Sequence, residues 1–136
     1  MKSLTIAVCL LAMAIPATAK PKPKVQKFNA NCADVWEAAK IAVQEHYDVL
    51  TLNDQTRSGS FTTGSIWTGV RPLTFSLRDS GPISTLTSET GCEVSVTGHF
   101  SGLIHNDKAA FFNRLSVALQ SYTWGKSTAA KSSEAK

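Results

Sequence analysis

The spacing of apolar residues predicts an amphipathic helix over residues 31–47. Apolar side chains recur there at steps of three and four residues, which places them on one face of a helix. Asn31 suits the N-cap, because its side-chain oxygen can accept from free N–H groups of the first turn. Asp34 in that turn complements the helix dipole. The apolar stripe comprises Cys32, Val35, Trp36, Ala39, Ala42, Val43 and Tyr47.

Apolar and polar residues alternate with a period of two elsewhere, which predicts strands. The strands are expected at residues 25–28 (an edge strand), 48–53, 60–63, 73–78 and 92–100, with turns at 54–59 and 79–82. Residues 83–90 are rich in serine and threonine and read as strand and loop. The clearest strand is 92–100, with one apolar row of Cys92, Val94, Val96 and Phe100 and one polar row of Glu93, Ser95, Thr97 and His99.

A second helix is predicted over residues 107–122, with an apolar stripe that includes Phe111, Leu115 and Tyr122. Strands that alternate in polarity form an antiparallel sheet with one face covered, and both helices have the broad stripe needed to cover it. We therefore expect an α+β fold in two layers, with an antiparallel sheet of about four to five strands and two helices on one face. The open face should meet water or a partner.

Residues 64–72 follow neither period and leave two interpretations open. They place Ile66, Trp67 and Val70 between Gly64, Gly69 and Pro72. In the first interpretation the segment is a hairpin whose Trp67 packs on the sheet, which is the more usual place for a large aromatic residue. In the second, the segment is an exposed patch that binds a partner.

The first residues have the layout of a secretory signal peptide, which we expect to be removed after residue 19. Lys2 precedes a short apolar run, Pro16 breaks that run, and Ala17 and Ala19 form a small-x-small cleavage signal. The run is too short for a membrane-spanning helix, which needs about 20 apolar residues. A Lys/Pro spacer over residues 20–24, a single domain over 25–124 and a disordered tail over 125–136 complete the expected organisation.

Charge excludes one class of partner. The chain carries a formal net charge of +4, but six basic residues stand against nine acidic ones between Phe28 and Gly125. The positive charge therefore lies in the terminal segments, and a basic surface for nucleic acid is not expected. Weak contact of these segments with anionic lipid or polymer is compatible with the pattern.

Two cysteines remain once Cys9 leaves with the signal peptide. Cys32 begins the apolar stripe of the first helix, and Cys92 begins the apolar row of the clearest strand. An even cysteine count in an oxidising compartment indicates a disulfide. We predict a Cys32–Cys92 bridge; the alternative is two buried free thiols.

The pattern resembles small helix-on-sheet domains of bacterial cell-envelope proteins, such as the C-terminal domains of the BamC-type lipoprotein. The resemblance spans about residues 25–122 and rests on the helix with Asp34-Val35-Trp36 and Ala38-Ala39, the strand with Asp48-Val49-Leu50, and the closing helix. It implies no catalytic residues and no cofactor. Unlike that family, this chain has no lipid-attachment cysteine.

No motif indicates catalysis. His46, His99 and His105 lack metal-ligand spacing, and Glu89 and Glu93 flank a turn. Nucleotide-binding loops, CxxC and Gly-x-Ser-x-Gly are absent from the sequence. Arg57, Arg71 and Arg78 would bind an anion only if the fold brought them together.

Two functional hypotheses follow. The first is an exported, non-enzymatic domain that binds a protein or polymer of the cell envelope, without stable membrane insertion. It would use the segment with Ile66, Trp67 and Val70, or the open sheet face with Thr97 and His99. The second is a small secreted hydrolase that uses His99, His105 and a serine.

Overall fold

The computed structural model describes residues 21–84, 87–98 and 106–134. The elements within these ranges are β1 (Lys24–Phe28), α1 (Cys32–His46), β2 (Asp48–Asn53), β3 (Ser58–Thr63), β4 (Arg71–Ser84), β5 (Thr87–Gly98) and α2 (Asp107–Glu134). The expected signal peptide lies outside the described residues, as do His99, Phe100 and His105.

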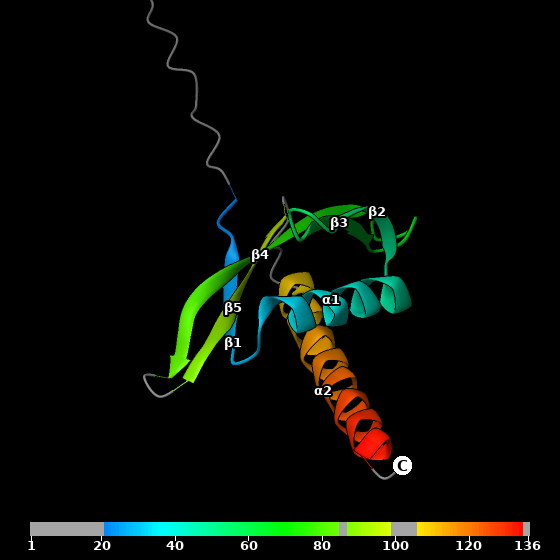
Figure 1. Ribbon diagram of the computed structural model, residues 1–136. Helices are drawn as coiled ribbons and strands as arrows, with labels where there is room; N and C mark the ends of the chain where they lie inside the picture. Colours follow the sequence, from blue (N-terminus) through cyan, green and yellow to red (C-terminus); the bar gives the residue numbers. More distant parts are fainter. Residues whose placement is uncertain (1–20, 85–86, 99–105, 135–136) are drawn as a thin grey trace, which may run out of the picture.

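The strands form one antiparallel sheet of five strands in the order β1-β5-β4-β3-β2. Both helices lie against one face of this twisted sheet and pack on each other (Figure 1). The predicted two-layer α+β fold is confirmed. It places β1 and β2 at opposite edges of the sheet, joined by α1.

Helix α1 begins and ends where the sequence predicts. The Asn31 Oδ1 atom accepts from the Asp34 N–H at 2.8 Å, and Tyr47 leaves the helix with φ −141°. The predicted apolar stripe is buried except at Tyr47, which is half-buried and packs against the core. Its hydrophobic burial, rather than helix propensity, is therefore the main stabilisation of α1.

The core lies between the helices and the inner rows of β3, β4 and β5. Phe111 of α2 stands 5.3 Å, centroid to centroid, from both Phe61 of β3 and Phe75 of β4. Trp36 of α1 lies 5.8 Å from Phe75. These rings hold both helices on the sheet through contacts that each stabilise by about 0.5–1.5 kcal/mol beyond burial.

The predicted disulfide is present between Cys32 and Cys92, with a Cα–Cα distance of 4.8 Å. Both cysteines are buried, so the bridge joins the first turn of α1 to the inner row of β5. The two residues are 60 apart in sequence. In the chain-entropy model, closing such a loop stabilises the fold by roughly 4 kcal/mol.

Two predicted boundaries are wrong. No turn forms at 79–82: β4 continues to Ser84 through register shifts next to Gly81, which adopts φ +87°, so the irregularity is a bulge within a long hairpin. The segment after Gly125, expected to be disordered, continues α2 to Glu134. Hydroxyls of its serines and threonines bond carbonyls one turn back, and Lys126 Nζ reaches Asp34 Oδ1 of α1 at 2.8 Å.

The apolar alternation of β2 is also interrupted. A register shift between Val49 and Thr51 leaves Leu50 56% exposed, although it lies two residues from Leu52 in the same strand. Only Leu52 packs against the core. A bulge in an edge strand disturbs its ladder and protects it from pairing with other chains.

Candidate functional site: the loop between β3 and β4

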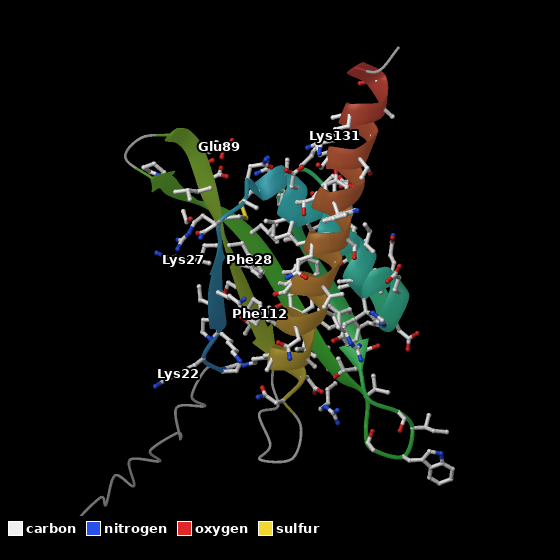
Figure 2. All side chains as sticks on the ribbon, turned by 90° about the horizontal axis from the view of Figure 1, so that it is seen from below. Lys22, Lys27, Phe28, Glu89, Phe112 and Lys131 are labelled. Atoms are coloured by element: carbon white, nitrogen blue, oxygen red, sulfur yellow. A yellow bond between two sulfur atoms is a disulfide. The ribbon has the colours of Figure 1, made fainter. Side chains whose placement is uncertain are left out.

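The loop that joins β3 to β4, residues 64–70, presents apolar side chains to solvent. Ile66 is 86% exposed, Trp67 90% and Val70 60%. The expectation that Trp67 packs on the sheet is therefore wrong, because the loop extends beyond the body of the protein (Figure 2). The structure brings Ile66, Trp67 and Val70 together in one exposed segment, which we call the apolar loop.

The tip of the apolar loop is a hydrogen-bonded turn. The Thr68 N–H donates to the Ser65 carbonyl at 3.1 Å, which leaves Ile66 and Trp67 at the two central positions. The Ser65 N–H donates to Thr68 Oγ1 at 3.0 Å, and the Trp67 N–H donates to Ser65 Oγ at 3.3 Å. Because these polar groups bond one another, the turn keeps its shape while its apolar side chains face outward.

The two ends of the loop meet at glycines. Gly64 has φ +95°, and a Cβ atom built on it would lie 2.2 Å from the Gly69 carbonyl oxygen. Any side chain at residue 64 would thus collide with backbone and would also strain a left-handed conformation. The sequence GSIWTG is therefore suited to a loop that closes tightly on itself.

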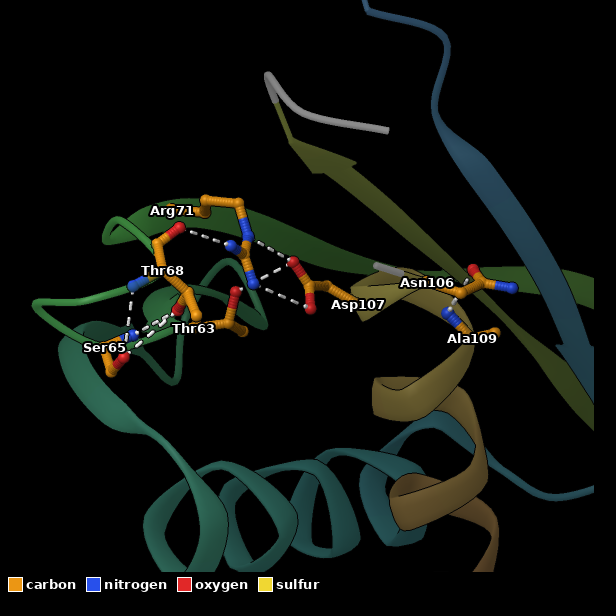
Figure 3. Close-up of polar contacts among 7 residues, drawn as sticks. All are labelled: Thr63, Ser65, Thr68, Arg71, Asn106, Asp107 and Ala109. Carbon is orange, nitrogen blue, oxygen red and sulfur yellow. Dashed lines mark hydrogen bonds and ion pairs between the residues drawn. The ribbon is translucent and has the colours of Figure 1, made fainter. Parts of the chain in front are cut away.

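The base of the loop is tied to the first residue of α2 (Figure 3). Arg71 donates to Asp107 through Nε at 2.7 Å and Nη2 at 3.4 Å, and through Nη1 to the Thr68 carbonyl at 3.2 Å. Thr63 Oγ1 donates to Asp107 Oδ2 at 3.0 Å. The Arg71 and Asp107 side chains are mostly buried, so this bidentate pair fixes the loop more firmly than a surface ion pair would.

The N-terminus of α2 favours this arrangement. The Asn106 side chain accepts from the Ala109 N–H at 3.3 Å, and Asp107 stands in the first turn, where the helix dipole favours a carboxylate. The Asp107 side chain thus stabilises the start of α2 and also anchors the apolar loop. The sequence did not predict this anchoring, because Thr63, Arg71 and Asp107 come from three separate elements.

A polar hollow of about 340 Å³ lies beside the loop on the β2 side. Its lining includes Glu45 and Asp48 together with Gly64 at the start of the loop. His46, expected at the end of α1, is exposed there and lies 3.9 Å from Glu45. The apolar loop therefore has an acidic neighbour on one side.

The other predicted binding residue that the structure describes, Thr97, belongs to a different surface. It lies on the open face of β5 and pairs with Thr74 of β4. A shallow hollow of about 510 Å³ on this face is lined mainly by hydroxyl and amide side chains, namely Thr51, Asn53, Ser58, Ser60, Thr74, Ser76, Ser95 and Thr97. His99, predicted alongside Thr97, lies outside the described residues.

The three arginines do not converge on a common anion site. Arg57 lies 3.8 Å from Asp79, Arg71 is bound by Asp107, and Arg78 is paired with Glu93 across the open face. Glu93 is thus engaged in a cross-strand ion pair, and Glu89 is exposed at the other end of the strand. Within residues 21–84, 87–98 and 106–134, no group of three His, Cys, Asp or Glu residues is arranged to hold a metal ion.

Sequence reasoning missed one further apolar surface, a groove of about 560 Å³ between α1 and α2. Its lining includes Ile41, Val117 and Ala118 together with Arg114 and His46. Val117 is exposed and falls outside the predicted stripe of α2. An apolar residue off the stripe was the signal available in the sequence.

Neither helix in the described part of the chain is long and apolar enough to cross a membrane. No protein-family model matches the chain, and no curated protein matches it. The functional argument therefore rests on the geometry of the apolar loop and its surroundings.

Proposed function

We propose that this protein is an exported, non-enzymatic domain that binds a partner at the cell envelope through the apolar loop. The observation that carries the proposal is the exposure of Ile66 and Trp67 on a turn whose polar groups bond one another. Folding gains little from side chains in that position, so their apolar character points to contact with another molecule.

The rigidity of the loop supports a binding role. A segment that is already ordered loses less conformational entropy on association than a flexible one. Tryptophan is also the residue type most enriched among those that carry binding energy. The Arg71–Asp107 pair and the Gly64–Gly69 contact therefore serve to preorganise the apolar loop for its partner.

Export is supported by two independent features. The N-terminal layout predicts a signal peptide. The buried Cys32–Cys92 disulfide is the kind of cross-link that persists in oxidising compartments. Intact-mass measurement of the exported protein tests this part, and a mature species that retains Met1 to Ala19 would contradict it.

Capture from envelope extract tests the binding role. The mature protein, immobilised, should retain a partner that the Trp67→Ala variant loses. Trp124→Ala is the matched control, because Trp124 is also a strongly exposed tryptophan (76%) but lies on α2. Equal capture by all three proteins would contradict a role for the apolar loop. An untargeted activity screen completes the test, since turnover would favour the hydrolase alternative.

A further inference from the structure

The shape of the apolar loop limits the kind of surface that can bind it. The loop is a convex tip, and the hollow beside it is polar and lined by Glu45 and Asp48. The receiving surface must therefore supply all of the apolar environment for Ile66 and Trp67. A lipid surface can do so without a shaped pocket.

The chemistry of the tip fits the boundary between headgroups and acyl chains. Tryptophan is enriched at this depth because its ring is apolar while its N–H can still bond water or headgroups. Trp67 is 90% exposed, and Ile66 beside it and Val70 add aliphatic surface. The backbone groups of the turn bond within the turn, which lowers the cost of moving it out of water.

Basic residues lie at the same end of the molecule. Asp107, which anchors the loop, is followed by Lys108, whose Nζ donates to the Lys22 carbonyl at 3.0 Å. Lys108 is half-buried, whereas Lys22 is exposed. Lys24, which begins β1, is exposed too, with its Nζ 6.0 Å from the centre of the Phe112 ring. In Figure 2, Lys22 and the apolar loop lie on opposite sides of the same end of the protein, whereas Glu89 and Lys131 lie toward the other end. One surface can thus meet the apolar loop and these lysines together.

The charges nearest the loop do not all favour an anionic surface. Arg71 is neutralised by Asp107, and Glu45 and Asp48 lie on the β2 side. The attraction to anionic headgroups must then come from Lys22, Lys24 and Lys108, each of which contributes only within about a Debye length. The apolar loop and the lysines therefore make separable contributions.

From these observations we infer that the partner of the apolar loop is an anionic lipid surface. Ile66 and Trp67 enter its interfacial layer while Lys22, Lys24 and Lys108 face the headgroups. The inference rests on the proposed function and names its partner class. The contact is peripheral, made by a loop and a basic rim without a membrane-spanning element.

Vesicle binding tests the inference. The mature protein is mixed with vesicles of phosphatidylcholine and phosphatidylglycerol, in a Trp124→Phe background that leaves Trp67 and the buried Trp36 as emitters. We expect a blue shift of tryptophan emission and co-sedimentation with the vesicles. Trp67→Ala should weaken binding at least roughly tenfold, since burial of a large apolar side chain commonly exceeds the free energy of a tenfold change.

A second set of variants tests the lysines. Replacing Lys22, Lys24 and Lys108 together by glutamine should weaken binding to the anionic vesicles and leave any binding to pure phosphatidylcholine unchanged. Each lysine is expected to contribute up to roughly fivefold near the surface. Lys131→Gln, at the other end of the molecule, is the matched control.

The outcomes separate this inference from the proposed function. If vesicles of neither composition bind while capture from envelope extract depends on Trp67, the partner is a protein or polymer and the lipid inference is overturned. If vesicles bind equally well to Trp67→Ala, the inference is also overturned, because the loop is then not the contact. If neither vesicles nor extract distinguish Trp67→Ala from the parent, both proposals fail.

Discussion

Trp36 and Trp67 have opposite environments in the same domain. Trp36 is 4% exposed, lies against Phe75, and donates its indole N–H to Asp54 Oδ1 at 2.7 Å. Trp67 is 90% exposed at the tip of the apolar loop. The two loops that flank β3 thus differ in role. The β2–β3 turn places Asp54 next to the buried Trp36, whereas the β3–β4 loop holds Trp67 away from the core.

The difference between Trp36 and Trp67 shows which exposed or buried residues can be explained by folding alone. Asp54 and Asp107 each fix one end of β3 to a helix, through Trp36 and Lys40 in the first case and through Thr63 in the second. The anchoring explains the shape of both loops. Only Trp36 contributes its apolar surface to the core, and the exposed Trp67 is the residue that we propose to contact a partner.

The largest expected effect is at the buried tryptophan. Trp36→Ala should lower the free energy of unfolding by about 3–5 kcal/mol, because it leaves a cavity beside Phe75 and removes the donor to Asp54. Denaturant unfolding measures this change, with Trp124→Ala as the control. A loss no greater than that of the control would mean that Trp36 is not a core residue in solution.

The anchor of the apolar loop should give an intermediate effect. Arg71→Ala removes the guanidinium that binds Asp107 and the Thr68 carbonyl, and we expect a loss of about 1–3 kcal/mol. Amide exchange should rise in residues 64–70 and stay constant in β5. Unchanged exchange in the loop would show that its own turn is sufficient to order it.

The contacts of Asp54 predict that the stability of the fold depends on pH. Its pKa lies below the usual value because the carboxylate accepts from Trp36 and then from Lys40, with the positive charge of Lys40 adding to the effect. The contribution to stability is therefore full above about pH 4, the unfolded pKa, and is lost as pH falls through the lower folded pKa. Asp54 is exposed, so the loss should be smaller than for Arg71→Ala.

Unfolding midpoints of the parent and Asp54→Asn, compared between pH 6 and 2.5, isolate this contribution. The asparagine can still accept from Trp36 but cannot titrate. The difference between the two proteins should shrink below about pH 4. A constant difference across the range would show that the Asp54 contacts do not depend on its charge.

The smallest effect on stability is expected at the apolar loop itself. Trp67→Ala should change the free energy of unfolding by less than about 0.5 kcal/mol, because the side chain is exposed. The same variant should show the largest effect on binding. A large stability loss would mean that Trp67 packs on the protein in solution, and would end the contrast with Trp36.

The elements with a complete apolar period were predictable from sequence. Helix α1 and residues 92–98 of β5 each keep their apolar period without interruption, and the positions of Cys32 and Cys92 in those patterns predicted their bridge correctly. Periodicity works there because burial on one face decides the structure. It gives no information past Tyr122 in α2, where residues 123–133 are exposed and the helix continues through local hydrogen bonds and the contact of Lys126 with Asp34.

The sequence identified the segment that forms the candidate site but not its three-dimensional arrangement. Residues 64–72 stood out because Ile66, Trp67 and Val70 fit neither a helix nor a strand between their glycines. Their exposure depends on Thr63, Arg71 and Asp107 meeting from three elements, and on the Gly64–Gly69 approach. Such long-range contacts leave no periodic trace, so the more usual burial of tryptophan was the wrong guide.

The order of the strands in the sheet also predicts the order in which they pair during folding. Strands β2 to β5 pair with neighbours in the chain, whereas β1 pairs with β5, so that Phe28 meets Cys92. Local pairings form faster than distant ones, because less chain entropy is lost in closing them. We expect the meander of β2 to β5 to become protected first in pulsed hydrogen exchange and β1 last. In a chain that emerges from its N-terminus, β1 would then be the first strand to appear and the last to pair. Cys32 would remain a free thiol until Cys92, 60 residues later in the sequence, has emerged.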